Sequence, residues 1–455
     1  MVGDVSRFAI WLSVWIAVLA AVAFLRRKRR SAGVGLTLTY LFQLSVFHFL
    51  GAAIYLLPWD WTGSDPGVVE LGLEQSVYGL LGFAMGAVLV APSLTRLFGV
   101  TKNVSVTTAP EPLLAKVYLA VGIVFYVLSA TFLGRIPTVG AVMGTGRAFL
   151  LVGLGLSAWA ALRSERKFAF LAWIGVAMWL PMFTLVSSGF LGFGAVALVV
   201  VVALVASLRG IGPRGAIVAL LLIYLGLSVY VTYMRDRKDI RDVVWTGGDL
   251  VARFQKVEDM VRGFEWFDPY NTDHLDRIDG RLNQNTLVGA AVDYVGSNAS
   301  SFARGETILE AFWAVIPRII WPDKPVAAGS GTWVSRYTGI TFEENTSVGM
   351  GQVLEFYINF GTAGVVIGFL LLGTAVAAVD SVARSRVVLG DWPGFVLWYV
   401  PGTALLQAGG SLVEITSSAG AAAVAAILIN RYVFLRLRAT TPGASVHESL
   451  AVRAG

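Results

Sequence analysis

The sequence contains no cysteine, only three histidines and few charged residues. Without cysteine there are no thiolate metal sites, disulfide bonds or cysteine nucleophiles, so any part outside the membrane must be held together by packing. Charged residues make up 14% of the chain, against about 25% in an ordinary soluble domain. Because 56% of the 455 residues are hydrophobic, the composition excludes a soluble globular enzyme and indicates a polytopic membrane protein.

Long apolar runs recur from the N-terminus to about residue 435, each near the roughly 20 residues that cross a bilayer as a helix. They predict an all-α polytopic membrane protein with about eleven transmembrane helices. The expected spans cover residues 8–25, 35–57, 77–92, 113–133, 147–162, 168–188, 190–208, 215–234, 357–379, 392–410 and 415–434.

The basic residues predict the orientation of these spans. The first span is followed by Arg26, Arg27, Lys28, Arg29 and Arg30 and lacks a cleavage-site pattern, so we expect an uncleaved anchor with its N-terminus outside. Of the 22 Lys and Arg outside the large polar stretch described below, 19 fall on the same, inward side of the eleven spans. Because these basic residues follow the positive-inside rule, the pI of about 9.5 does not require a nucleic-acid partner.

Four segments follow from the span assignment. We expect transmembrane helices 1–8 in residues 1–234, a large extracytoplasmic loop in 235–347, transmembrane helices 9–11 in 348–438 and a cytoplasmic tail in 439–455. The loop holds 13 Lys or Arg and 17 Asp or Glu. A connection of this length is either a small domain or a functional lid.

The loop is rich in aromatic residues and contains two helical patterns. Its aromatic residues include Trp245, Trp266, Phe267, Tyr270, Trp313, Trp321, Trp333 and Tyr337. Such rings suit either the membrane interface or a sugar-binding surface, and the sequence leaves both open. Helices are expected near 285–297 and 305–320, and the second, too short to span, should lie on the outer leaflet until Pro317 bends or ends it.

Cations follow this second helix. Arg318 and Lys324, with Asp323 between them, precede a glycine-rich turn and Arg336. Two cations and a flexible turn beside a buried helix suit a clamp for a phosphate or diphosphate. Long cationic side chains that reach for the membrane interface are the alternative interpretation.

A carboxylate marks the start of the ninth span. Glu355 enters an apolar helix and is followed by Asn359, Gly361 and Gly364. A charged side chain at this depth is costly unless it is paired or functional. Glu355 is therefore a candidate functional residue.

The order of these motifs resembles a known family. IPRIIWPDKP at residues 316–325, a glycine-rich turn and the helix entry EFYINFG at 355–361 look like the outer-loop region of bacterial oligosaccharide repeat-unit polymerases. These are the O-antigen or exopolysaccharide polymerases of the Wzy type, relatives of the O-antigen ligases. The close resemblance covers residues 311–373, and the layout of many spans with one late outer loop extends it loosely to most of the chain.

The resemblance implies a function at the outer face of a bacterial cytoplasmic membrane. Such enzymes transfer a polyprenyl-diphosphate-linked glycan to a sugar hydroxyl of another lipid-linked repeat unit. It implies a helical bundle like that of other lipid-sugar glycosyltransferases, with membrane lipids and other polysaccharide assembly proteins as partners, and without a nucleotide sugar, a metal or another cofactor.

Site residues are assigned to the steps of this reaction. The cations expected to hold the diphosphate are Arg318, Arg336, Lys324, Arg135 and Arg235. Glu355 is the candidate base, with His274 as the alternative, although the charge-rich run around His274 also suits a surface turn. The rings expected to contact glycan are Trp321, Trp333 and Tyr337.

One departure from the family affects the diphosphate site. Many relatives carry a Ser-Gly-Ser-Arg-like turn between two mid-chain spans, whereas this chain has Ser187, Ser188 and Gly189 and no arginine in 168–208. Arg135, Arg147 or Arg235 would have to take that role.

Two other functions fit the same features. A ligase would pass the glycan to a different acceptor, and a non-catalytic exporter or flippase would need cations, aromatic rings and a cavity as well. A transporter should carry ionisable residues near the bilayer midplane. His48 in mid-span is expected to hydrogen-bond between helices, and Glu414 to cap the last span.

Overall fold

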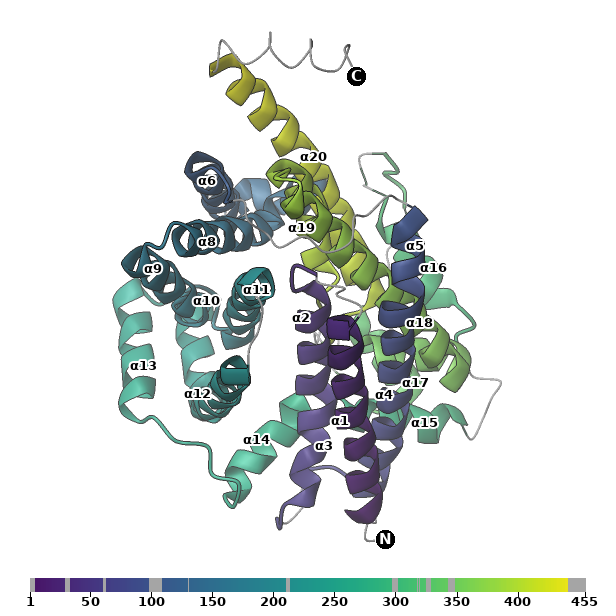
Figure 1. Cartoon of the computed structure of the whole chain (residues 1–455). Coiled ribbons are helices and arrows are strands. Elements are labelled where there is room, and N and C mark those ends of the chain that lie inside the picture. The colour runs from purple at the N-terminus through teal and green to yellow at the C-terminus, as the bar shows by residue number, and fades with distance from the viewer. Residues whose placement is uncertain are drawn as a thin grey trace.

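The structure is a computed structural model. It describes residues 5–28, 33–59, 63–97, 109–129, 131–209, 213–296, 302–316, 318, 320–324, 329–342 and 348–440. Within these ranges the chain forms helices and no strand. The expected all-α class is confirmed. The N-terminus lies at one end of the molecule and the end of the last helix at the other (Figure 1).

The first fifth of the chain forms the centre of the molecule (Figure 1). Its helices are α1 (Val5–Lys28), α2 (Leu36–Leu44), the π-helix η1 (Ser45–Leu50), α3 (Gly51–Ala53), the 3₁₀-helix η2 (Ile54–Leu56), α4 (Pro66–Met85), the π-helix η3 (Gly86–Val90) and α5 (Ala91–Leu97). Pro66 begins α4 at a position that needs no N–H, and the side chain of Asp65 accepts from Gly67 N.

A second group of helices lies to one side. It contains α6 (Pro112–Ser129), η4 (Phe132–Arg135), α7 (Pro137–Gly144), α8 (Gly146–Arg163), α9 (Lys167–Met178), α10 (Leu180–Ser188), α11 (Leu191–Arg209) and α12 (Pro213–Trp245). The last of these helices continues through residues 235–245, the first eleven residues of the expected loop, because polar residues continue its helical turns beyond the apolar run. The first part of the expected loop is therefore helix.

The described part of the loop holds five further helices: α13 (Leu250–Arg262), α14 (Thr272–Leu282), α15 (Asn285–Gly296), α16 (Glu306–Ala314) and α17 (Ser330–Thr338). The helices expected at 285–297 and 305–320 are present as α15 and α16, although α16 ends at Ala314. Pro317, which was expected to end it, lies outside the described residues. The chain ends with α18 (Gln352–Val388), α19 (Trp392–Ala404) and α20 (Leu412–Thr440).

Ten helices in the described part of the chain are long and apolar enough to cross a membrane, against the expected eleven. The difference is the expected span 392–410, which is helical only as α19. Its 13 residues reach roughly 20 Å at 1.5 Å per residue, short of a hydrocarbon core of about 30 Å.

The segment after α19 nevertheless returns the chain to the start of α18. Gln352 Nε2 donates to the carbonyl oxygens of Gln407 and Gly410, each at 2.6 Å, and Gly351 N donates to Gly409 O at 3.1 Å. These bonds supply partners for irregular backbone that a membrane interior would otherwise leave unpaired.

A polar cluster holds α15 in the bundle. His48 Nδ1 lies 2.9 Å from Asn285 Oδ1 and 2.8 Å from Ser76 Oγ, and Asn285 Nδ2 donates to His48 O at 2.8 Å. Gly289 permits the close approach of α15 to α4, because a Cβ there would overlap Val68 O. His48 thus bonds between helices, as expected for its mid-span position.

The orientation can be tested in the cysteine-free chain. We expect Tyr270→Cys to react with an impermeant thiol reagent on intact cells and Ser164→Cys to react only after lysis. Both positions are exposed, and the charge distribution predicts opposite sides for them. Labelling of position 270 only after lysis would contradict the predicted orientation.

Candidate functional site

A pocket of about 190 Å³ lies where the loop helices meet the start of the last spans. It is lined by Thr307 and Glu310 of α16, Gly329, Ser330 and Trp333 at the start of α17, Met350 and Glu355 at α18, and Ser411, Val413 and Glu414 at α20. Pockets that enclose drug-sized ligands start at about 300 Å³. This pocket can therefore enclose one small group, and a larger substrate would extend outside it.

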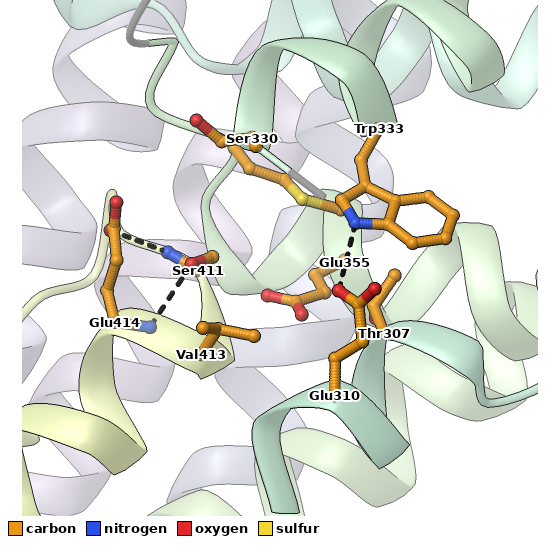
Figure 2. Close-up of a pocket in the computed structure, with 10 residues that line it drawn as sticks. Thr307, Glu310, Ser330, Trp333, Glu355, Ser411, Val413 and Glu414 are labelled. Carbon is orange, nitrogen blue, oxygen red and sulfur yellow. Dashed lines mark hydrogen bonds between the residues drawn. The ribbon is translucent and has the colours of Figure 1, made fainter. Parts of the chain in front are cut away.

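Glu355 forms the buried side of this pocket. It is 1% exposed, and its Oε2 accepts from Leu412 N at 2.6 Å, at the first turn of α20. The backbone N–H groups of a helix N-terminus favour a negative charge there. In Figure 2 the Glu355 carboxylate points into the space between Glu310 and Glu414.

Glu414 has a separate role in the same turn. Its Oε2 accepts from Ser411 N at 3.1 Å, and Ser411 Oγ accepts from Glu414 N at 3.3 Å (Figure 2). This reciprocal pair is a capping box for α20. The expected capping role of Glu414 is confirmed, whereas Glu355 contributes a further acceptor from another helix.

A break in α18 follows Glu355 directly. Phe360 and Gly361 leave helical geometry, and Gly361 has φ 62°, which suits glycine. Asn359, the last helical residue before the break, donates to Thr307 Oγ1 at 2.7 Å and accepts from Gly305 N at 2.8 Å. Asn359 thus fixes the start of α16 against the turn of helix that carries Glu355.

Trp333 lines the pocket, and it is in contact with Tyr337 and Arg336 of the same helix. Trp333 Nε1 donates to Glu310 Oε2 at 3.2 Å. Trp333 stacks on Tyr337, and the Arg336 guanidinium carbon lies 5.7 Å and 5.4 Å from the two ring centres. The Arg336 side chain is 60% exposed and reaches Glu306 only at 3.9 Å. Of the predicted site residues, Glu355, Trp333, Tyr337 and Arg336 are therefore brought together.

Arg318 and Lys324 contact backbone carbonyls, and neither lines the pocket. Lys324 Nζ donates to Ile316 O at 2.8 Å and Ala314 O at 3.3 Å. Arg318 Nη1 donates to Lys324 O at 3.0 Å and Pro322 O at 3.3 Å. The third predicted residue of this segment, Trp321, contacts Trp313 edge-on. These contacts support a structural role for the segment after α16.

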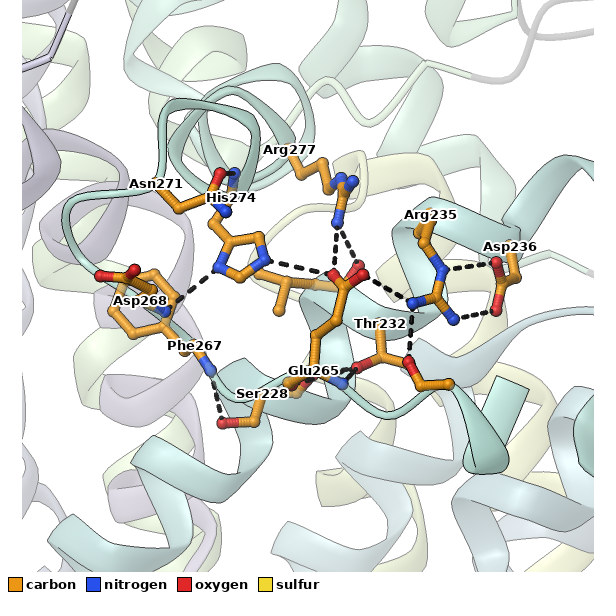
Figure 3. Close-up of polar contacts among 12 residues, drawn as sticks. Ser228, Thr232, Arg235, Asp236, Glu265, Phe267, Asp268, Asn271, His274 and Arg277 are labelled. Carbon is orange, nitrogen blue, oxygen red and sulfur yellow. Dashed lines mark hydrogen bonds and ion pairs between the residues drawn. The ribbon is translucent and has the colours of Figure 1, made fainter. Parts of the chain in front are cut away.

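Arg235 and His274 lie in a second cluster, centred on Glu265 (Figure 3). Arg235 pairs with Glu265 at 2.6 Å and, through two nitrogens, with Asp236 at 2.7 and 2.8 Å. Arg277 also pairs with Glu265, at 3.2 Å. Burial raises the pKa of Glu265, but the hydrogen bonds from Arg235, His274 and Arg277 outweigh it and leave this pKa below its usual value.

The expected charge-rich turn around His274 is instead helix α14, where His274 is 4% exposed. His274 Nδ1 accepts from Asp268 N at 3.1 Å, so Nε2 carries the proton donated to Glu265 Oε2 at 3.2 Å. Both ring nitrogens of His274 and the guanidinium of Arg235 therefore already have partners, which supports structural roles over the predicted base and diphosphate-binding roles.

The mid-chain turn at Ser187, Ser188 and Gly189 contains no arginine of its own, but an arginine from α12 contacts it. Arg241 of α12 donates from Nε to Gly189 O at 3.4 Å, and its guanidinium carbon lies 4.3 Å from the ring centre of Phe190. Sequence reasoning missed Arg241, because only the continuation of α12 past residue 234 carries it there. Arg147 lies over Phe193 at 5.0 Å, and Arg135 is exposed at the end of η4.

Sequence reasoning also missed Thr307, Glu310, Met350 and Ser411 as pocket residues, since nothing in their local sequence indicates a site. Among the described residues no group of three or more His, Asp or Glu is arranged to hold a metal ion.

Comparison with known proteins finds a family model that matches the chain. Residues 97–392, more than half of the chain, match a family described as a domain of unknown function (DUF8712). No curated protein and no solved structure matches the chain.

Proposed function

The chain belongs to the DUF8712 family, a domain of unknown function, and we propose that it is a membrane glycosyltransferase that polymerises a lipid-linked glycan at the outer face of a bacterial cytoplasmic membrane. One observation carries the proposal. A buried carboxylate, Glu355, faces a pocket with an aromatic side at the point where the loop helices meet two candidate spans.

The reaction is a displacement at an anomeric carbon. The acceptor sugar hydroxyl forms a bond to this carbon and loses its proton to Glu355, while the bond to the lipid diphosphate breaks and the diphosphate keeps the electron pair. The pocket needs to enclose only the reacting sugar, and the rest of both glycans and both lipids lies outside it. General-base catalysis of this kind requires the carboxylate within hydrogen-bond reach of the hydroxyl.

The rings and the exposed cation beside the pocket have complementary roles. Trp333 is 5% exposed and contributes to a sugar site only the part of its ring that lines the pocket, while its Nε1 keeps Glu310 in place. Arg336, held over Trp333 and Tyr337, offers two parallel N–H groups for phosphate oxygens. We therefore assign the diphosphate to Arg336 first, ahead of Arg318, Lys324, Arg135 and Arg235.

The test is the length distribution of lipid-linked glycan in cells. Cells that lack the protein should accumulate single repeat units, and the native chain should restore long glycans. Arg336→Ala should leave single units, and Arg336→Lys should restore little, because an ammonium cannot bind two phosphate oxygens in one plane. Arg262→Ala is the matched control, since Arg262 is an exposed loop arginine that pairs with Glu258 of its own helix. Normal glycan length in Arg336→Ala would remove this residue from the site.

The same experiment separates the other two functions. Long unattached chains in the deletion strain would indicate a ligase, and glycan retained inside would indicate an exporter. One observation favours the exporter as second candidate. The break in α18 at Phe360 and Gly361 lies beside a buried carboxylate, and discontinuous helices with such groups are found in transporters.

A further inference from the structure

The direction of α16 relative to α20 determines where the outer loop lies. Thr307 and Glu310 line the same pocket as Ser411, Val413 and Glu414. One turn further along both helices, Thr416 Oγ1 donates to Ala311 O at 2.7 Å. A further turn on, Val315 O lies 3.3 Å from where a Cβ on Gly420 would stand. The two helices therefore run side by side in the same direction, away from the start of α20.

The start of α20 is also the expected outer boundary of the hydrocarbon. Leu412–Tyr432 is a candidate span, and Arg431 is its first basic residue. About 20 helical residues cross a hydrocarbon core of about 30 Å, so counting back from Arg431 places the outer boundary near Ser411. Gly420 lies eight residues past Leu412, roughly 12 Å deeper at 1.5 Å per residue. Val315 lies at the same depth.

We propose that α16 and the chain up to Lys324 form a re-entrant segment in the outer half of the bilayer, with lipid acyl chains covering its outward face. The helix expected on the surface of the outer leaflet would then enter it. Among the described residues of the segment, four apolar side chains are largely exposed: Leu309 is 53% exposed, Phe312 67%, Val315 45% and Ile320 73%. They continue the apolar surface of α20 itself, where Ile427 and Leu428 are 54% and 58% exposed.

The contacts at the far end of the segment fit this position. Irregular backbone is tolerated at membrane depth only where its polar groups find partners in the protein. Lys324 donates to the carbonyl oxygens of Ala314 and Ile316, and Arg318 donates to those of Pro322 and Lys324. The two cations thus supply donors to four carbonyl groups that follow the end of α16.

After this segment the chain returns to the depth in the membrane at which α16 begins. Gly329, Ser330 and Trp333 line the pocket together with Thr307, where α16 begins. The chain therefore descends along α20 from Thr307 to Val315 and is back beside the pocket at Gly329.

Nitroxide labels on single cysteines test the depth directly. The full-length protein is placed in lipid bilayers with a label at Phe312→Cys or, as an independent second site, Ile320→Cys. Collision rates with oxygen, which concentrates in hydrocarbon, and with a water-soluble nickel chelate are then measured. Ile427→Cys is the reference within a span, and Tyr270→Cys, 76% exposed, is the reference for the outer loop.

We expect both segment labels to collide with oxygen as often as the label at position 427 and rarely with nickel. Nickel access equal to that at position 270 would place α16 in water and overturn the proposal. Low collision rates with both reagents would show that protein, rather than lipid, covers this face and would overturn it as well. The readout requires no catalytic activity, so it is independent of the proposed function.

Discussion

Replacing Glu355 with glutamine should lower the rate of glycan polymerisation by about a hundredfold to ten-thousandfold, the usual effect of losing a general base. The amide keeps the shape of the side chain and can still accept the hydrogen bond from Leu412 N, which the native carboxylate accepts at 2.6 Å. What it loses is the ability to take the proton of the acceptor hydroxyl. Stability and donor binding should change little.

The measurement uses purified protein in lipid with a lipid-linked donor, and compares donor binding with the initial rate of chain growth. Glu414→Gln is the matched control. It changes a carboxylate of the same pocket to an amide, but Glu414 is exposed and belongs to the capping box of α20. We expect this variant to retain most of its activity.

Glu355 also has a structural interpretation, in which it only caps α20. In that case Glu355→Gln would keep full activity, and the main effect would be a slightly lowered melting temperature, since the amide keeps the hydrogen bond from Leu412 N but loses the negative charge at the start of α20, which contributes about 0.3–1 kcal/mol. Full activity in this variant would contradict the role of Glu355 as the base. The next candidate base to replace would then be Glu310, which lines the same pocket.

The second large effect is expected at Asp380, at the opposite end of α18. Asp380→Ala should lower the free energy of unfolding by about 3–5 kcal/mol, because it removes one member of a buried ion pair together with the acceptor of several buried hydrogen bonds. Asp380 is 1% exposed and pairs with Arg26 at 3.0 Å. It also accepts from Thr37 Oγ1 at 2.7 Å and from the backbone N–H groups of Val34, Leu36 and Thr37, at 2.7, 3.1 and 3.3 Å.

Asp391→Ala is the matched control for this prediction. Asp391 also accepts from a helix N-terminus, Gly394 N at 2.8 Å, and pairs with an arginine, Arg386, at 3.2 Å. Its side chain is 34% exposed and that of Arg386 44%, so its loss should affect stability by about 1 kcal/mol. Unfolding of both variants is followed in the same detergent, and equal losses would contradict the role of burial at Asp380.

Features that depend on a continuous stretch of residues could be predicted from the sequence. A span is an apolar run of about 20 residues, and such a run is visible without any neighbour in space. The same holds for α15 and α16, whose apolar residues repeat with the helical period. Glu355 was recognisable because a carboxylate at the entry of an apolar helix is costly in any fold.

The contacts of charged side chains were predicted less successfully, because the sequence around a charged residue does not show which group that residue will pair with. Arg235 looked available for a diphosphate but contacts Asp236 and Glu265. The mid-chain turn at Gly189 looked empty of arginine until α12 brought Arg241 to it. The sequence around either residue of such a contact does not indicate the other residue.

The sequence by itself determined the helical class, the membrane-spanning character and the carboxylate at the start of α18, since each is a property of a local run of residues. Only the tertiary structure decided which carboxylate faces a pocket, which cations already have partners and that α16 runs along α20. The physical reason is separation along the chain. Glu355 meets Leu412, and Asp380 meets Val34, across 57 and 346 residues, and only packing of the whole bundle brings such groups together.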